Sequence, residues 1–225
     1  MKDNRYSLRA LALLLGYPDA TLRQQLPALM EALDQEGAIP VARRVELRSL
    51  AAELSRHDPL EVEAQYVETF DRGRATSLHL FEHVHGDSRD RGPAMVDLAQ
   101  TYEKAGLRLS AEELPDHLCV VLEFASTQPP QLAQDFLGEM AHILTSIFSA
   151  LLKRGSPYAA AVAAVLELAG QRVQAVPFAA DEPLDESWAE PEAFDGCSTK
   201  GQSRPGEAQP IHIVRKAPAA QGAAV

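Results

Sequence analysis

Apolar residues recur every three or four positions through most of the chain, which is the spacing of an amphipathic helix. Near the start, Leu8, Leu11 and Leu15 fall on one helical face. Glycine and proline then separate this segment from several others with the same spacing. The apolar positions of those later segments are Leu22, Leu26, Leu29, Leu33, Val41, Val45, Leu47, Leu50, Leu54, Val62, Tyr66, Val67, Phe70, Met95, Leu98, Ala99, Tyr102 and Ala105. Because no convincing run alternates apolar and polar residues as a strand would, the pattern predicts an all-α fold.

The second half of the chain carries helix start and stop signals. Ser110-Ala-Glu-Glu113 matches a capping box, in which serine and glutamate satisfy free backbone donors, so it predicts a helix start. That helix can restart at Pro115 before the apolar run DHLCVVLEFA. Apolar residues from Leu132 to Leu151 predict one long helix, and an alanine-rich helix follows Pro157. In total we expect about seven to nine helices, with antiparallel neighbours because the breaks are short.

The composition changes near residue 178. The segment DEPLDESWAEPEAFD carries seven acidic residues and no basic one, and such a segment buries too little apolar surface to offset its ordering entropy. We therefore expect residues 1–179 to form one helical domain and residues 180–225 to form a mostly disordered acidic tail. The large apolar residues of this tail, which could fold back on the domain or dock on a partner, are Leu184, Trp188 and Phe194.

Charge and cysteine content narrow the class of protein. A formal net charge of −11 argues against nucleic-acid binding, which needs a basic face, and favours a cationic partner. No run approaches the length of a membrane-spanning helix, and the apolar stretch from Ala10 to Leu15 lacks a following signal-peptide cleavage site. Cys119, expected to be a buried thiol, and Cys197 form no CxxC motif. We therefore expect a cytoplasmic protein with no direct membrane insertion.

The stretch FEHVHGDSRDRGPAM concentrates polar residues, and it is open to two readings. His79-Leu-Phe-Glu82-His83 matches H-x-x-E-H, an inverted zinc-protease pattern in which Glu82 would act as the base. A zinc hydrolase would also need a third ligand, for which His117 or His142 would have to serve. The pattern is short and arises by chance, so a zinc hydrolase is the lesser alternative.

The second reading of this stretch is a structural hinge between helices. Gly86 supplies a backbone conformation that other residues resist. Arg89 and Arg91 can form charge-assisted hydrogen bonds with Glu82 or Asp87. No Walker loop, GxGxxG, GxSxG or CxxC motif accompanies them, so we expect no enzyme, no bound metal and no cofactor.

Taken together, the motifs LLGYPDATL, YVETFDRGRATSLHLFEHVHGDSRDRGPAMVDLAQTYEKAGL and ELPDHLCVVLEF carry a resemblance. They closely resemble the assembly chaperones of respiratory nitrate reductase, the NarJ type, which are related to the TorD and DmsD chaperones of other molybdenum oxidoreductases. The match is looser from Gln128 to Phe178. The resemblance implies an all-helical protein that is not an enzyme.

The same resemblance implies the partners. Members of the family bind the catalytic subunit of respiratory nitrate reductase while it lacks cofactor, through its N-terminal segment and a second region. They assist insertion of the molybdenum cofactor, delay docking on the membrane subunit and are absent from the finished enzyme. Proteins of molybdenum cofactor biosynthesis are further expected partners. A chaperone for a different molybdenum enzyme remains the nearest alternative.

We expect a basic amphipathic peptide to lay its apolar face in a groove between helices. Asp116-His117 matches an aspartate–histidine pair that related chaperones place at their signal-binding surface. A packing or capping role is the competing interpretation for each residue. The candidate peptide-binding residues are Tyr66, Phe70, Leu80, Phe81, Glu82, His83, Asp87, Arg89, Arg91, Asp116 and His117.

Overall fold

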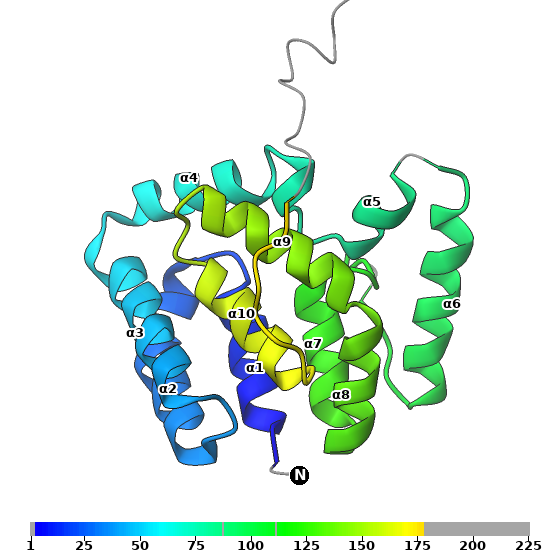
Figure 1. The fold of residues 1–225 in the computed structure, drawn as a ribbon, viewed down its shortest axis with the longest axis horizontal. Helices are drawn as coiled ribbons and strands as arrows, with labels where there is room; N and C mark the ends of the chain where they lie inside the picture. The colour runs from blue at the N-terminus through cyan, green and yellow to red at the C-terminus, as the bar shows by residue number, and fades with distance from the viewer. Residues whose placement is uncertain (1–2, 87, 111, 178–225) are drawn as a thin grey trace, which may run out of the picture. The chain divides into compact units, whose positions relative to one another are not determined.

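A computed structural model describes residues 3–86, 88–110 and 112–177, and these residues fold as ten α-helices and one short 3₁₀ helix without a strand (Figure 1). The elements are α1 (Arg5–Leu14), α2 (Ala20–Glu36), α3 (Val41–Arg56), α4 (Pro59–Phe70), η1 (Arg74–Thr76), α5 (Leu80–His85), α6 (Arg91–Lys104), α7 (Leu118–Thr127), α8 (Pro130–Glu139), α9 (Ala141–Lys153) and α10 (Ala159–Leu168). The predicted all-α fold is confirmed. The predicted tail, residues 180–225, lies outside the described residues, so the boundary at residue 179 stays a prediction.

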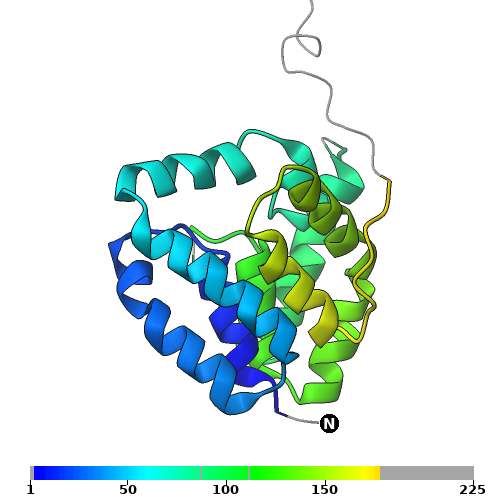
Figure 2. The same ribbon diagram turned by 60° about the vertical axis from the view of Figure 1, so that its left-hand side comes forward.

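Helix α10 forms the centre of the packing. Nine of its ten residues are buried, and most of them are alanine and valine. Small side chains let neighbouring helices approach closely, and α10 packs against α1, α3, α8 and α9. Figures 1 and 2 show these helices around it. The core is therefore built around a helix that is apolar on all sides.

Local signals set several helix ends as the sequence predicts. The Asp19 carboxylate accepts a hydrogen bond from the Leu22 N–H at the start of α2, which satisfies a free donor of the first turn. Gly37 ends α2 in a left-handed conformation, with φ of 61°. Asp58 caps α4 in the same way as Asp19 caps α2, and Pro59 occupies the first turn.

Three local predictions are wrong. The helix expected over Leu132 to Leu151 is two helices, α8 and α9, which meet at Met140 with a bend of 69°. Because the chain turns at Met140, the apolar faces of both α8 and α9 contact α10. Val41 and Val45 were expected on the inward face of α3, but they are 68% and 58% exposed. The inward face is formed instead by Leu47, Leu50 and Leu54.

The capping-box prediction also fails. The Ser110 N–H does donate to the Glu113 carboxylate, at 3.2 Å, but α7 begins only at Leu118. The His117 ring accepts a hydrogen bond from the Cys119 N–H and so caps α7. The hydrogen bond predicted for a helix start therefore stabilises a turn in the connection before α7.

The apolar helices do not reach the length of a membrane span. Within the described residues no single helix is long and apolar enough to cross a membrane. Helices α8 and α9 taken together would be long and apolar enough, but the chain bends by 69° between them.

Candidate functional site

The connections that precede α5 and α7 meet side by side. His79 and His117 pair as an isolated antiparallel bridge, and the Leu80 N–H donates to the Asp116 carbonyl at 3.0 Å. The two imidazole rings lie edge to face, with centroids 4.9 Å apart. Residues almost forty positions apart in sequence therefore form one polar site at the starts of two helices.

Asp116 is the buried centre of this site. Its side chain is fully buried, and the Phe81 N–H donates to its carboxylate at 3.1 Å. The Arg91 guanidinium lies 3.8 Å from one carboxylate oxygen, and the His79 Nδ1 lies 3.6 Å from the other. Both distances are those of ion pairs rather than of hydrogen bonds. One carboxylate thus contacts the start of α5, the start of α6 and the connection between η1 and α5.

Glu82 extends the network along α5. The Ser77 hydroxyl donates to its carboxylate at 2.6 Å, and Arg91 lies 3.4 Å from the other oxygen. The Arg74 guanidinium donates twice to the Glu82 carbonyl, at 2.6 and 3.0 Å. His83 Nε2 lies 2.9 Å from the Ser77 carbonyl. We call Arg74, Ser77, His79, Glu82, Arg91 and Asp116 the Asp116 network.

The surroundings shift the pKa of three groups in and beside this network. The Asp116 carboxylate raises the pKa of His79 above its usual value, against the opposing effect of burial. Burial alone would raise the pKa of Asp116, but His79, the Phe81 N–H and the charge of Arg91 together hold that pKa below its usual value. Burial, followed by the charge of His79, lowers the pKa of His117. The network therefore favours an ionised Asp116, a protonated His79 and a neutral His117.

Several predicted site residues lie together in this region. Glu82, Arg91 and Asp116 are partners in the network, and His83 and His117 lie at its edge. Two polar candidates remain. Arg89 is exposed, and Asp87 lies outside the described residues.

The apolar candidates are placed differently. Tyr66, Phe70 and Leu80 are buried in the main core. The Tyr66 hydroxyl donates to the Leu15 carbonyl at 2.9 Å, and its ring packs on Phe70 with centroids 4.8 Å apart. These side chains support the site from within, so they offer no free surface to a peptide. Phe81 is only partly buried, against a second apolar cluster.

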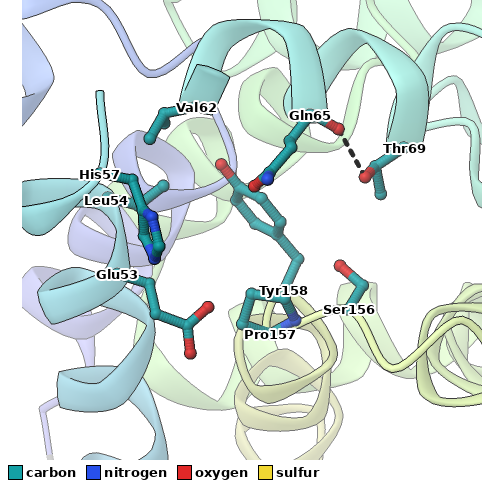
Figure 3. Close-up of a pocket in the computed structure, with 9 residues that line it drawn as sticks. All are labelled: Glu53, Leu54, His57, Val62, Gln65, Thr69, Ser156, Pro157 and Tyr158. Atoms are coloured by element: carbon teal, nitrogen blue, oxygen red, sulfur yellow. Dashed lines mark hydrogen bonds between the residues drawn. The ribbon is translucent and has the colours of Figure 1, made fainter. Parts of the chain in front are cut away.

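A small cavity lies beside this aromatic core, between the α3–α4 connection and the start of α10. Figure 3 shows Tyr158 extending from the start of α10 towards α4. The cavity has a volume of about 40 Å³, which suits a water-sized group and is too small for a cofactor. Its lining residues are Glu53, Leu54, His57, Val62, Gln65, Thr69, Ser156, Pro157 and Tyr158.

A larger groove, missed by the sequence analysis, lies among α1, α6, α7 and the connection before α7. It has a volume of about 230 Å³, with a floor that includes Tyr102, Val120 and Phe124. Its exposed charged residues are Glu113, Glu123, Arg9 and Arg108, two of each sign, and the residues that complete the lining are Leu107, Leu109, Ser126 and Thr127. The sequence signal for this groove is weak: Leu107 and Leu109 are apolar residues in the connection between α6 and α7, and their spacing is not that of a helix.

The zinc alternative finds no support in this geometry. His79 precedes α5 instead of lying on it, and it faces Asp116, whereas His83 faces the Ser77 carbonyl. Among residues 3–86, 88–110 and 112–177, no group of three or more His, Cys, Asp or Glu side chains could hold a metal ion. The H-x-x-E-H spacing is therefore a coincidence of sequence within the part of the chain described.

The fold and this site define a helical protein with a surface groove and a supporting charge network. A crystal structure of an Archaeoglobus fulgidus protein assigned to redox enzyme maturation has the same fold, with a TM-score of 0.52 and 22% identity. The match covers 74% of this chain and 94% of that one, and it concerns the fold alone. The chain belongs to the nitrate reductase delta subunit family, whose model matches residues 19–164.

Two curated relatives give the family membership more detail. The chain is 44% identical over 185 residues to the nitrate reductase molybdenum cofactor assembly chaperone NarJ of Escherichia coli K12, covering 81% of this chain and 77% of that one. It is 38% identical over 155 residues to the nitrate reductase-like protein NarX of Mycobacterium tuberculosis H37Rv, covering 68% of this chain and 23% of that protein. The resemblance stated from sequence is confirmed, and so is the expectation that the chain is not an enzyme.

Proposed function

We propose that this chain is an assembly chaperone that binds the catalytic subunit of respiratory nitrate reductase before its cofactor is in place. It assists insertion of the molybdenum cofactor and delays docking on the membrane subunit, then leaves the mature enzyme. The observation that carries this proposal is the 44% identity, over most of both chains, to a relative named as such a chaperone. Its site of action is the cytoplasm, where the client subunit folds.

The groove among α1, α6 and α7 is the surface on which we place the client's N-terminal segment. Its apolar floor suits the apolar face of an amphipathic helix, a mode in which side chains one turn apart provide the anchors. Glu113 and Glu123 suit basic residues on the flanks of that helix, and Arg9 and Arg108 in the same lining suit acidic ones. The Asp116 network supports the groove, because Arg91 is at the start of α6 and Asp116 lies just before α7.

Release requires that this affinity depend on the state of the client. A ligand shifts an equilibrium only through its different affinities for two states. The segment must therefore bind the chaperone better than it binds the immature subunit, and less well than it binds the folded, cofactor-loaded one. A second client region and proteins of cofactor biosynthesis add contacts outside the groove.

Co-purification tests the proposal most directly. The full chain, recovered from cells that lack molybdenum cofactor, should carry the apo catalytic subunit of nitrate reductase and should lose it when cofactor synthesis is restored. Recovery of a different apo-molybdoenzyme would assign the chain to that enzyme instead. If the chain binds neither the apo subunit nor its N-terminal segment, the proposal is wrong.

Charge reversal tests the place of binding. The double variant Glu113→Lys, Glu123→Lys should bind the client's N-terminal peptide about tenfold more weakly, as measured by titration calorimetry, because these positions then repel basic residues. The matched control is Glu103→Lys, Glu139→Lys, which changes the net charge equally at exposed positions that do not line the groove. Equal weakening in both variants would place the peptide elsewhere.

A further inference from the structure

Helix α6 is held to the rest of the described structure by few side chains. Only Leu98 and Tyr102 of its fourteen residues are buried, whereas α10 buries nine of its ten. These two side chains pack with Phe124 in a cluster that is separate from the main core. Figure 1 shows α6 at the edge of the helical arrangement, joined to α5 and α7 by connections at its two ends. Segments with so little buried surface open at low free energy.

Both connections contain a glycine in a conformation that suits a sharp turn. Gly86, before α6, has φ of 53°, and Gly106, after α6, has φ of 83°. The backbone of other residues resists these values. Because glycine has the widest backbone freedom, these two positions are where the direction of α6 can change.

The contact that holds the start of α6 is loosely formed. Arg91 lies 3.4 Å from Glu82 and 3.8 Å from Asp116, both longer than charge-assisted hydrogen bonds, and its buried Nε atom has no hydrogen-bond partner. Charges taken out of water without full pairing gain little from each other. At the other end, the Tyr102 hydroxyl donates to the Pro115 carbonyl at 2.8 Å.

We propose that α6 is a displaceable cover, and that the surface beneath it binds a partner helix that carries the same pattern as α6. Arg91, Leu98 and Tyr102 are spaced by seven and four residues, so they lie on one helical face. The partner helix carries a cation, a large apolar residue two turns later and an aromatic residue one further turn on. Its cation pairs with Glu82 and Asp116, and its apolar residues pack on Phe124.

Two observations select this occupant. Asp116 is fully buried and Glu82 is partly buried, and both carboxylates lose a cationic partner when Arg91 leaves, so they favour a cation in its place. The apolar residues that form one cluster with Leu98 and Tyr102 of α6 are Phe81, Leu107, Leu109, Val120, Phe124 and Phe136. This aromatic and aliphatic surface fits side chains of the size of leucine and tyrosine. The proposal rests on the proposed function only for the source of the partner helix, which would be the client subunit. Tyr102 of α6 lines the groove, so displacement of α6 widens that same groove and the two proposals concern one surface.

Hydrogen exchange of the full chain tests the cover. Arg91→Gln should make the α6 amides exchange about tenfold faster, while α10 keeps its protection, because only the contact at the start of α6 is lost. The matched control is Arg89→Gln, which removes the same charge from an exposed side chain two residues away. Equal loss of protection in α6 and α10, or no change in α6, would show that α6 is not a displaceable cover.

A peptide probe tests the surface beneath it. A synthetic peptide of residues 88–106 should bind the Arg91→Gln chain about tenfold more tightly than the unaltered chain, because less free energy then holds α6 in place. The same peptide with Leu98→Ala and Tyr102→Ala should not bind. If the α6 amides of Arg91→Gln exchange faster and the peptide still does not bind, the docking surface is wrong. Neither experiment contains nitrate reductase, so their failure leaves the chaperone proposal standing, and the co-purification test decides that proposal separately.

Discussion

At the scale of single residues, Asp116 connects more of the site than any sequence motif indicates. Its buried carboxylate contacts the Phe81 N–H, His79 and Arg91. A buried carboxylate is stable as an ion only when such partners offset its lost hydration. The residue therefore stabilises the meeting of three segments, whatever binds in the neighbouring groove.

Asp116→Asn should destabilise the fold. The amide keeps the shape of the carboxyl group but leaves His79 without its negative partner and Arg91 with Glu82 alone, and we expect a loss of about 2–4 kcal/mol. Urea unfolding at neutral pH, followed by circular dichroism, measures it. Asp135→Asn, at an exposed position on α8, should stay within about 0.5 kcal/mol of the unaltered chain. Equal effects would show that the buried ion pairs contribute nothing.

His79 should make stability depend on pH. Its pKa is raised in the folded protein by Asp116, so its contribution is fully present below the ordinary pKa of about 6.5 and is lost as pH rises through the raised value. The stability difference between the unaltered chain and His79→Gln should therefore shrink as pH rises above about 6.5. Urea unfolding over this range measures it.

A double-mutant cycle gives the control. In an Asp116→Asn background the same substitution, His79→Gln, should lose most of its pH dependence, since the carboxylate that raises the pKa of His79 is gone. A pH dependence of equal size in both backgrounds would assign the effect to another group.

At the scale of elements, the connections matter as much as the helices. Helix α5 is six residues long, too short to be stable alone, and its Glu82 carbonyl accepts hydrogen bonds from both the Arg74 guanidinium and the Gly86 N–H. The polar stretch that looked like an active site is therefore a junction that joins η1, α5 and α6. The same junction places Arg91, at the start of α6, 3.8 Å from Asp116.

Gly86→Ala should weaken this junction. The position has φ of 53°, and a Cβ atom there would collide with the Arg74 guanidinium that bonds the Glu82 carbonyl. We expect a loss of about 1–2 kcal/mol, measured by thermal or urea unfolding. Gly92→Ala is the matched control, because a Cβ at that helical position meets nothing within 4 Å. It should be neutral or stabilise by up to about 1 kcal/mol, and the junction argument fails if the two behave alike.

At the scale of the whole molecule, stability is unevenly distributed over the described residues. Helix α10 is packed on all sides, and α6 is attached through two buried side chains. A chaperone benefits from this division, because a rigid centre keeps the fold intact while a weakly held edge responds to a client.

Ala163→Leu tests the rigid centre. Ala163 is fully buried in α10, so the added side chain forces its neighbours apart, and we expect a loss of about 1–3 kcal/mol. Ala52→Leu, at a partly exposed position on α3, should change stability by less than about 0.5 kcal/mol. Unfolding curves of both variants measure this, and a tolerant Ala163 would mean that α10 is not tightly packed.

The sequence by itself determined the helical class, several helix ends and the family of this protein, because these depend on local spacing, on caps and on a long motif. It also placed Glu82, Arg91 and Asp116 among the candidate residues. Only the tertiary structure decided that Tyr66 and Leu80 are core residues, since burial depends on what packs above a helix face.

The groove could not be read from the sequence for the same reason. Arg9, Tyr102 and Val120 come from three helices that are far apart along the chain, and no local pattern records that they line one surface. The exposure of Val41 and the bend at Met140 likewise follow from how the helices share α10. Local chemistry therefore fixed which segments are helices, and packing between distant segments decided which of their side chains remain free to bind.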